Sequence, residues 1–170
     1  LIFITIFLVL VGNWSNFTQN NINNRLFGNW NIAVNEISKN ELAYFEYNAF
    51  INKYAIQYIQ EKIFLDDKTK IVIGSTEEKF IDIGNIEILS GRMPIKNNEV
   101  AVEKEYLSTL GVNKIGDIIS KDSSIKSLRG YSVCGILNDY SNRWKMVNWE
   151  MQYINCFIYE AKPNKIQVFL

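Results

Sequence analysis

The stretch that decides the fold is residues 90–119, which read SGRMPIKNNEVAVEKEYLSTLGVNKIGDII. Gly91 and Pro94 end the strand that comes before them, because both residue types interrupt a strand ladder. Asn97-Asn98 supplies turn-forming side chains, and residues 100–102 alternate between the two faces of a following strand. The first half of the stretch therefore predicts two short strands joined by a loop.

The second half of the stretch predicts a helix over residues 103–110. Its apolar side chains fall on one helical face, and Gly111 is the residue type that ends a helix in the left-handed conformation. Gly116-Asp117 then forms a tight turn into a further extended segment at 118–119. A strand, a helix and another extended segment are thus expected in close succession.

Upstream of this stretch the chain mixes strand and helix patterns. Residues 30–34 alternate as in a half-buried strand, and Asn40 can cap a helix whose apolar positions recur as far as Phe50. Ser75-Thr76-Glu77-Glu78 matches a capping box and predicts a short helix that Gly84 closes. Three further strands are predicted at 54–65, 70–74 and 86–89, with a turn at 66–68.

Downstream, strands are predicted at 131–137 and 153–159. A polar loop over 121–130 comes before the first of them, and an aromatic loop over 140–151 joins the two. Strands and helices do not alternate regularly, as they would around a parallel sheet. The predicted fold class is therefore α+β, with a mixed β-sheet and helices packed in a two-layer domain.

The composition excludes several classes of function. The chain of 170 residues carries 18 Lys or Arg and 18 Asp or Glu, so it has no basic surplus for nucleic-acid binding, and no nucleic-acid partner is expected. It has no histidine, which excludes catalytic triads and zinc sites that depend on histidine. The G-x-x-x-x-G-K-[ST] and G-x-S-x-G motifs are absent too. We therefore expect no enzyme activity, no cofactor and no metal.

Residues 1–11 read LIFITIFLVLV, an apolar run without a charge. As a helix this run covers roughly 16 Å, about half of the hydrocarbon thickness of a bilayer. Three interpretations are open: the C-terminal part of a transmembrane helix, the apolar part of a signal peptide, and a buried core helix. We favour a transmembrane segment over residues 1–12, because Trp14 follows where interfacial aromatic residues are common. Since the chain begins at Leu1, we expect it to be a fragment.

The rest of the chain divides into a linker over residues 13–29 and a domain over residues 30–170. Arg25 is the single charged residue of the linker, so the basic flank of a cytoplasmic exit is absent. The domain is therefore expected on the extracytoplasmic side of the cell membrane, and to be incomplete at its C-terminus. The many Ile and Asn residues favour a bacterial source.

An ordered series of short motifs resembles the extracytoplasmic core domain of MacB/FtsX-type ABC-transporter permeases. Members of that family commonly show the progression GR-x-P, NEV-x-V, LG, x-G-D-x-I and V-x-G-I. Residues 86–139 follow this progression in the same order and with similar spacing, and the wider resemblance extends over residues 1–170. The matching segments are ILSGRMP (88–94), NEVAV (98–102), the helix end at 107–111, IGDII (115–119) and VCGILND (133–139).

The resemblance implies a function in transport without catalysis by this chain. Such domains do not bind ATP, and a separate cytoplasmic ATP-binding subunit drives the membrane helices. The outer domain passes the motion to substrates, which can be peptides, antibiotics or lipoproteins, or it regulates an outer partner, as in FtsX. The expected partners are the ATP-binding subunit, a second permease copy and the membrane. The alternative is a membrane-anchored extracellular sensor or binding module without an ATPase partner.

The motif residues are expected to shape the fold rather than to react. This structural set comprises Gly91, Arg92, Pro94, Glu99, Gly111, Gly116, Asp117 and Gly135. Gly91 is expected where φ is positive or where two backbones pack closely. Arg92 and Glu99 flank a loop and could pair, which would add little stability if the pair is exposed.

Three further groups of residues leave alternatives open. Cys134 and Cys156 lie in two predicted strands. They either form a disulfide or remain two buried free thiols. Trp144 and Trp149 of the aromatic loop either contact a partner or close one end of the core. Asp139 belongs either to a ligand cleft or, as we favour, to a solvated loop.

Overall fold

The computed structural model describes residues 15, 17–24, 26, 28–47, 51, 53–66, 69–145 and 151–170. These residues contain a mixed eight-stranded sheet in the order β1-β8-β2-β3-β7-β5-β6-β4. The strands are β1 (Ala33–Val34), β2 (Ala55–Phe64), β3 (Lys70–Thr76), β4 (Ile88–Gly91), β5 (Glu99–Glu103), β6 (Ser132–Leu137), β7 (Cys156–Ile158) and β8 (Lys165–Phe169). The helices are α2 (Lys39–Tyr47), α3 (Glu78–Gly84) and α4 (Ser141–Lys145), with 3-10 turns η1 (Lys104–Tyr106) and η2 (Lys126–Leu128). The prediction of an α+β fold with a mixed sheet is confirmed.

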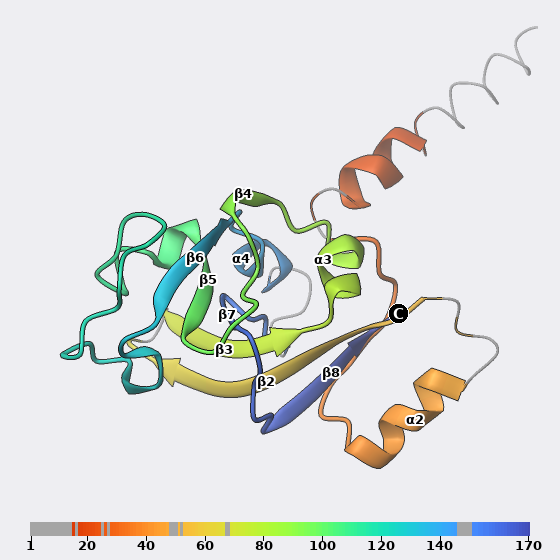
Figure 1. The fold of residues 1–170 in the computed structure, drawn as a ribbon. Helices are drawn as coiled ribbons and strands as arrows, with labels where there is room; N and C mark the ends of the chain where they lie inside the picture. Colours follow the sequence, from red (N-terminus) through yellow and green to blue (C-terminus); the bar gives the residue numbers. More distant parts are fainter. Residues whose placement is uncertain are drawn as a thin grey trace, which may run out of the picture.

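The sheet is mixed because two of its neighbouring pairs are parallel. β3 pairs parallel with β7, and β5 pairs parallel with β6. The other neighbours are antiparallel, including the long β2–β3 pair. β1 and β4 are the two ends of the sheet, and Figure 1 shows β4 far from the end where β2 and β8 lie.

The central strands are buried on both faces of the sheet, and their successive residues divide between two cores. In β3, Val72 packs into one core, whereas Ile71 and Ile73 pack into the other. In β5, Ala101 and Val102 divide in the same way. This period of two explains why the predicted strands contain nearly continuous apolar runs.

Different segments cover the two faces. Phe80 of α3 and Trp144 of α4 belong to the core on the first face. On the second face, α2 packs Leu42 and Phe45 against the β2–β8 end, and residues between β5 and β6 cover the centre. Figure 1 shows α3 and α4 together and α2 apart from them, beside β2 and β8. The loop predicted over 121–130 thus contributes core residues, including the fully buried Leu128.

Two predicted helix starts are wrong in detail. Ser38, not Asn40, caps α2, since Glu41 N donates to Ser38 Oγ (3.3 Å) and Ser38 N donates to the Glu41 carboxylate (2.8 Å). Ser75-Thr76 continues β3 instead of capping α3, because those residues pair with β2. Asn85, in the left-handed conformation with φ of 48°, closes α3 in place of Gly84.

The helix predicted over residues 103–110 is instead η1 followed by hydrogen-bonded turns. Glu103 pairs with β6 as the last residue of β5, so the extended backbone continues to the position where the predicted helix would begin. Residues 17–24, assigned to the linker, are helical. The predicted transmembrane segment and the predicted helix end at residues 48–50 lie outside the described residues.

Candidate functional site

The segments of the motif series meet at one strand, β6. β5 pairs with one edge of β6, and β4 pairs with the second half of its other edge. Residues 116–119 hydrogen-bond to the first half of that edge, where Gly116 N donates to Val133 O (2.8 Å) and Ile118 bridges to Ser132. Leu107 of the helix-end segment packs into the same buried cluster as Val133. Five segments spread over some fifty residues of sequence therefore form one structural unit.

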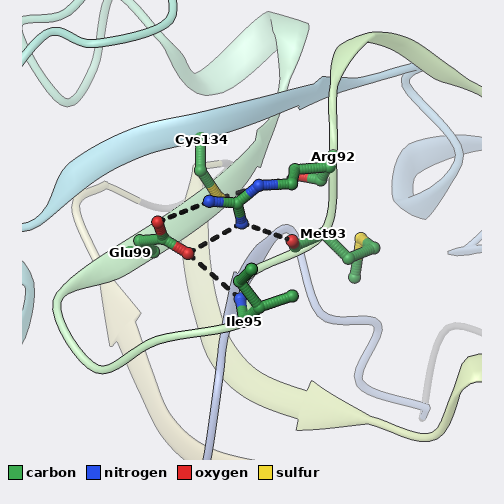
Figure 2. A network of polar contacts seen from close by, with 5 residues as sticks. All are labelled: Arg92, Met93, Ile95, Glu99 and Cys134. Carbon is green, nitrogen blue, oxygen red and sulfur yellow. Dashed lines mark hydrogen bonds and ion pairs between the residues drawn. The ribbon is translucent and has the colours of Figure 1, made fainter.

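Arg92 and Glu99 close the loop between β4 and β5, as Figure 2 shows. The two terminal nitrogens of Arg92 donate to the two Glu99 carboxylate oxygens, at 2.8 and 2.6 Å. Arg92 also donates to Met93 O (3.0 Å), and Ile95 N donates to Glu99 Oε2 (3.0 Å). Pro94 lies inside this loop, where its fixed φ reduces the freedom of the chain. We call this group of contacts the loop clamp.

The loop clamp keeps the Glu99 carboxylate ionised. The hydrogen bond from Arg92, followed by that from Ile95 N, lowers the pKa of Glu99 to about 2. The same contact raises the pKa of Arg92. The Glu99 side chain is 17% exposed and that of Arg92 is 45% exposed, so the carboxylate is more shielded than a surface ion pair. A two-point contact of this kind fixes the direction of the loop as well as its ends.

Gly91 and Gly135 lie opposite each other where β4 meets β6. Gly91 has φ of +76°, and a Cβ there would lie 2.2 Å from the Cys134 carbonyl oxygen. A Cβ at Gly135 would lie 2.2 Å from the Arg92 carbonyl oxygen. Only glycine permits this approach of the two backbones, which confirms the prediction for Gly91.

Asp117 fixes the turn that leads to the edge of β6. Its carboxylate accepts hydrogen bonds from Asn113 N (2.9 Å) and Lys114 N (3.1 Å), and these bonds lower the pKa of Asp117. Gly116 has φ of +89° and Gly111 has φ of +70°. These motif residues determine the backbone path, as predicted for turn positions.

The free edge of the sheet exposes aliphatic side chains beside the motif. β4 is the last strand in the sheet order, and all four of its residues are exposed. Ile88 and Leu89 of β4 and the neighbouring Ile115 and Ile118 are exposed large apolar residues. An edge strand with unpaired backbone groups and apolar neighbours is suited to contact with another chain.

Glu103, at the end of β5, is a buried carboxyl group that sequence reasoning missed. It has no exposed surface, and it accepts hydrogen bonds from Tyr140 N (3.1 Å), Ser141 N (2.7 Å) and Ser141 Oγ (2.7 Å). Burial raises the pKa of Glu103 to about 8, against the opposite effect of these bonds. Its partners follow 37 and 38 residues later, so no local motif could reveal the contact.

Asp139 lies close to this buried group but has a different role. Its carboxylate accepts a hydrogen bond from Glu105 N (2.9 Å), at the start of η1. Asp139 therefore ties the segment after β6 to the segment after β5. Asp139 thus lies in the short loop between β6 and α4, where its side chain forms a structural link.

Trp144 is fully buried, so the interpretation of this residue as a partner contact is wrong. α4 lies on the first face of the sheet and directs Trp144 into a cluster of aromatic rings. Its ring centroid lies 5.0 Å from that of Tyr140, 5.9 Å from Phe80 and 5.9 Å from Phe169. Trp149 lies outside the described residues.

Cys134 and Cys156 are buried free thiols, so the disulfide alternative is not formed. β5 lies between their strands, and the two thiols belong to the cores on opposite faces of the sheet. Burial raises the pKa of Cys134 to about 11 and raises that of Cys156 as well, which keeps both thiols protonated and unreactive.

Within the described part of the chain, no group of three or more His, Cys, Asp or Glu side chains could hold a metal ion. The hydrogen-bonded pair of Ser141 and Glu103 is closed to substrates, because both residues are fully buried. In the described ranges, no helix is both long enough and apolar enough to cross a membrane.

Comparison with known sequences returns no relative. No protein-family model matches the chain, and no curated protein matches it.

Comparison with solved structures returns domains of permeases and transporters. A domain of a protein named as a permease from Porphyromonas gingivalis is 15% identical, with a TM-score of 0.49 over 75% of this chain and 59% of that one. The extracellular domain of the ABC-type transporter YknZ from Gram-positive bacteria is 11% identical, with a TM-score of 0.44 over 78% and 72%. The periplasmic region of MacB from Actinobacillus actinomycetemcomitans is 12% identical, with a TM-score of 0.44 over 81% and 66%.

These structures are of the kind that the motif series in residues 86–139 resembles. At 11–15% identity the likeness concerns the fold. The chain spans 59% of the length of the Porphyromonas gingivalis domain.

Proposed function

We propose that the chain is the extracytoplasmic domain of an ABC-transporter permease subunit. The observation that carries the proposal is that the segments of the motif series meet at β6. These segments are separate in the sequence, yet each of them pairs with β6 or packs against it. The resemblance in sequence thus corresponds to a physical unit, whose parts the loop clamp and the Gly91–Gly135 contact hold together.

In this role the domain transmits force and does no chemistry. The central strands are buried on both faces of the sheet against packed side chains, so a displacement at one end moves the sheet as a body. Trp30 ties the N-terminal segment to the centre of the domain, since its ring centroid lies 5.4 Å from those of both Trp144 and Phe169. The exposed edge strand β4 provides a surface where an outer substrate or partner could receive the motion.

The proposed assembly contains a separate cytoplasmic ATP-binding subunit and a second permease copy. These 170 residues contain no phosphate-binding loop, so in the proposed assembly nucleotide hydrolysis takes place outside them. The apolar residues 1–11 would anchor the domain in the cell membrane. Peptides, antibiotics and lipoproteins are the substrate classes that the family resemblance suggests.

The test is to isolate the parent protein from its native membrane in mild detergent and identify what accompanies it. We expect a subunit with a Walker A motif to co-purify, ATP hydrolysis by the complex, and none by this chain alone. Isolation without an ATP-binding subunit, with an extracellular ligand still bound, would instead support the anchored sensor or binding module. ATP hydrolysis by the purified chain that persists through repurification would contradict the proposal.

A further inference from the structure

A surface cavity of about 590 Å³ lies between the N-terminal helical residues and the segments that follow α3 and β6. Its volume is in the range of cavities that hold small molecules. The lining residues are Ile22, Leu26, Asn85, Glu87, Asn138 and Arg143. The cavity therefore combines aliphatic side chains from one side with amide and charged groups from the other.

Arg143 is a half-buried cation that forms no ion pair with any residue of the described ranges. Among the described residues, no hydrogen bond or ion pair reaches its guanidinium, and its Nε is both inaccessible to solvent and unpaired. Arg143 precedes the fully buried Trp144 in α4, so packing holds its backbone in place. An unpaired buried donor is rare in proteins and indicates a missing partner, and for guanidinium that partner is an oxyanion.

Ile22 and Leu26 form the apolar wall of the cavity. They are one helical turn apart, so they lie on the same helical face, and they are 45% and 38% exposed. Main-chain bonds hold this face near the domain, since Gly28 N donates to Asn24 O (3.0 Å) and Asn29 N donates to Ile83 O (2.6 Å). Two exposed aliphatic side chains next to a cavity favour a ligand with an aliphatic part.

Two further lining residues restrict the head of such a ligand. Asn138 accepts a hydrogen bond from Glu87 N (3.3 Å), and its amide nitrogen donates to no residue of the described ranges. Asn138 can therefore donate to an oxygen held by Arg143. The Glu87 carboxylate lines the same cavity and repels a doubly charged head more strongly than a singly charged one. A singly charged oxyanion fits this combination.

We propose that this cavity binds a singly charged anionic amphiphile. The head, a carboxylate or a phosphodiester, pairs with the Arg143 guanidinium, and the aliphatic chain lies along Ile22 and Leu26. The chemistry is common to fatty acids and to anionic phospholipids, so two probes distinguish these sources. The site is independent of the loop clamp, and it can exist whether or not the chain belongs to a transporter.

The test follows the side-chain Nε–H signal of Arg143 by NMR in the whole chain, held in nanodiscs of zwitterionic lipid. The probes are octanoate and dihexanoylphosphatidylglycerol, with acetate, octanol and octylammonium as comparisons. We expect a saturable shift of the Arg143 signal with one or both anionic amphiphiles, and an affinity for octanoate at least about 10-fold above that for acetate, since each buried methylene adds about 0.8 kcal/mol. The Nε–H signal of Arg129, which donates to Ser123 O, should not move.

Variants test the charged part and the apolar part of the site separately, with octanoate binding measured by equilibrium dialysis. Arg143→Gln should weaken octanoate binding about 10-fold or more, whereas Arg129→Gln should not change it. Ile22→Asn should weaken octanoate binding severalfold, whereas the same change at the exposed Ile118 should have no effect. Near-UV circular dichroism verifies that each variant is folded.

Three results would overturn the proposal. The first is no saturable shift of the Arg143 signal in the folded chain with either anionic amphiphile. The second is equal binding of octylammonium, which would leave no role for the guanidinium. The third is a shift with an acidic peptide but with neither amphiphile, which would assign the cavity to a protein partner. Since none of these measurements involves an ATP-binding subunit, failure here is distinct from failure of the permease assignment.

Discussion

At the residue scale, Glu103 makes the stability of the domain depend on pH. Its folded-state pKa of about 8 lies above the ordinary value of 4.5, so the folded chain holds a proton that the unfolded chain releases between these values. The stabilisation is fully present below pH 4.5 and is lost as the pH rises through 8. Over this interval Glu103 lowers the free energy of unfolding by up to about 1.4 kcal/mol per pH unit.

Replacing Glu103 with Gln should remove this dependence. Gln has the shape of the protonated acid, and it can still accept from Ser141 N and donate to Ser141 Oγ. We therefore expect the variant to lose less stability than the natural chain between pH 5 and pH 9, measured by urea unfolding. Glu160→Gln, at an exposed position, is the matched control. Parallel curves for the natural chain and Glu103→Gln would contradict the burial argument.

Substitutions at three glycines can distinguish the cost of backbone strain from the cost of steric contact. Gly91 combines positive φ with a carbonyl oxygen 2.2 Å from the added Cβ, Gly135 has the contact alone, and Gly116 has positive φ in open space. Gly91→Val should destabilise the domain by on the order of 1–3 kcal/mol. In an alanine series measured by thermal unfolding, Gly91 should cost most and Gly116 least. A Gly116→Ala cost equal to that of Gly91→Ala would mean that the contact with β6 is unimportant.

At the element scale, the loop clamp should determine how the loop between β4 and β5 opens. The depressed pKa of Glu99, about 2, means that its contribution to stability is present above pH 4.5 and is lost as the pH falls toward 2. Between pH 5 and pH 2.5, the melting temperature of the natural chain should therefore fall further than that of the Glu99→Gln variant. Asp122→Asn, in an exposed loop, is the control.

The Ile95 amide gives a local measure of the same element, because it donates to Glu99 Oε2 from an otherwise exposed residue. Glu99→Gln and Arg92→Gln should each speed hydrogen exchange at Ile95 severalfold, while exchange at Ala101 in the centre of β5 should not change. If the Ile95 amide exchanged at the same rate in the natural chain and in both variants, the loop would be held closed by its backbone and not by the ion pair. Loss of partner binding in Arg92→Ala, with Ile95 exchange intact, would assign Arg92 to a contact site.

At the scale of the whole molecule, the membrane anchor and the folded domain should be separable at Asn29. A chain that begins at Asn29 keeps Trp30, whose ring packs between Trp144 and Phe169. We expect this shortened chain to leave the membrane fraction on carbonate washing and to keep its near-UV spectrum, whereas the full chain stays in the pellet. A chain that begins at Asn35 lacks both Trp30 and β1, and should unfold at a lower temperature. A chain from Asn29 that stays in the washed pellet would contradict the anchor at residues 1–12.

The sequence by itself determined the fold class and most of the strands, but β8 (Lys165–Phe169) was not among the predicted strands. Short apolar and alternating runs locate β2, β3, β5 and β6. Gly91 and Gly111 mark positions of positive φ. Both signals depend only on neighbours along the chain. The helix predicted over residues 103–110 failed for the same reason, since local pattern could not show that Glu103 pairs with β6.

Only the tertiary structure decided which side chains meet across the sheet. The burial of Glu103 beneath α4, the burial of Trp144, the placement of the two cysteines on opposite faces and the unpaired Arg143 all depend on residues far apart in sequence. A strand places its side chains on alternating faces, but the strand order determines what covers each face. That order is set by the total packing of the core, a property of the whole chain that no short motif contains.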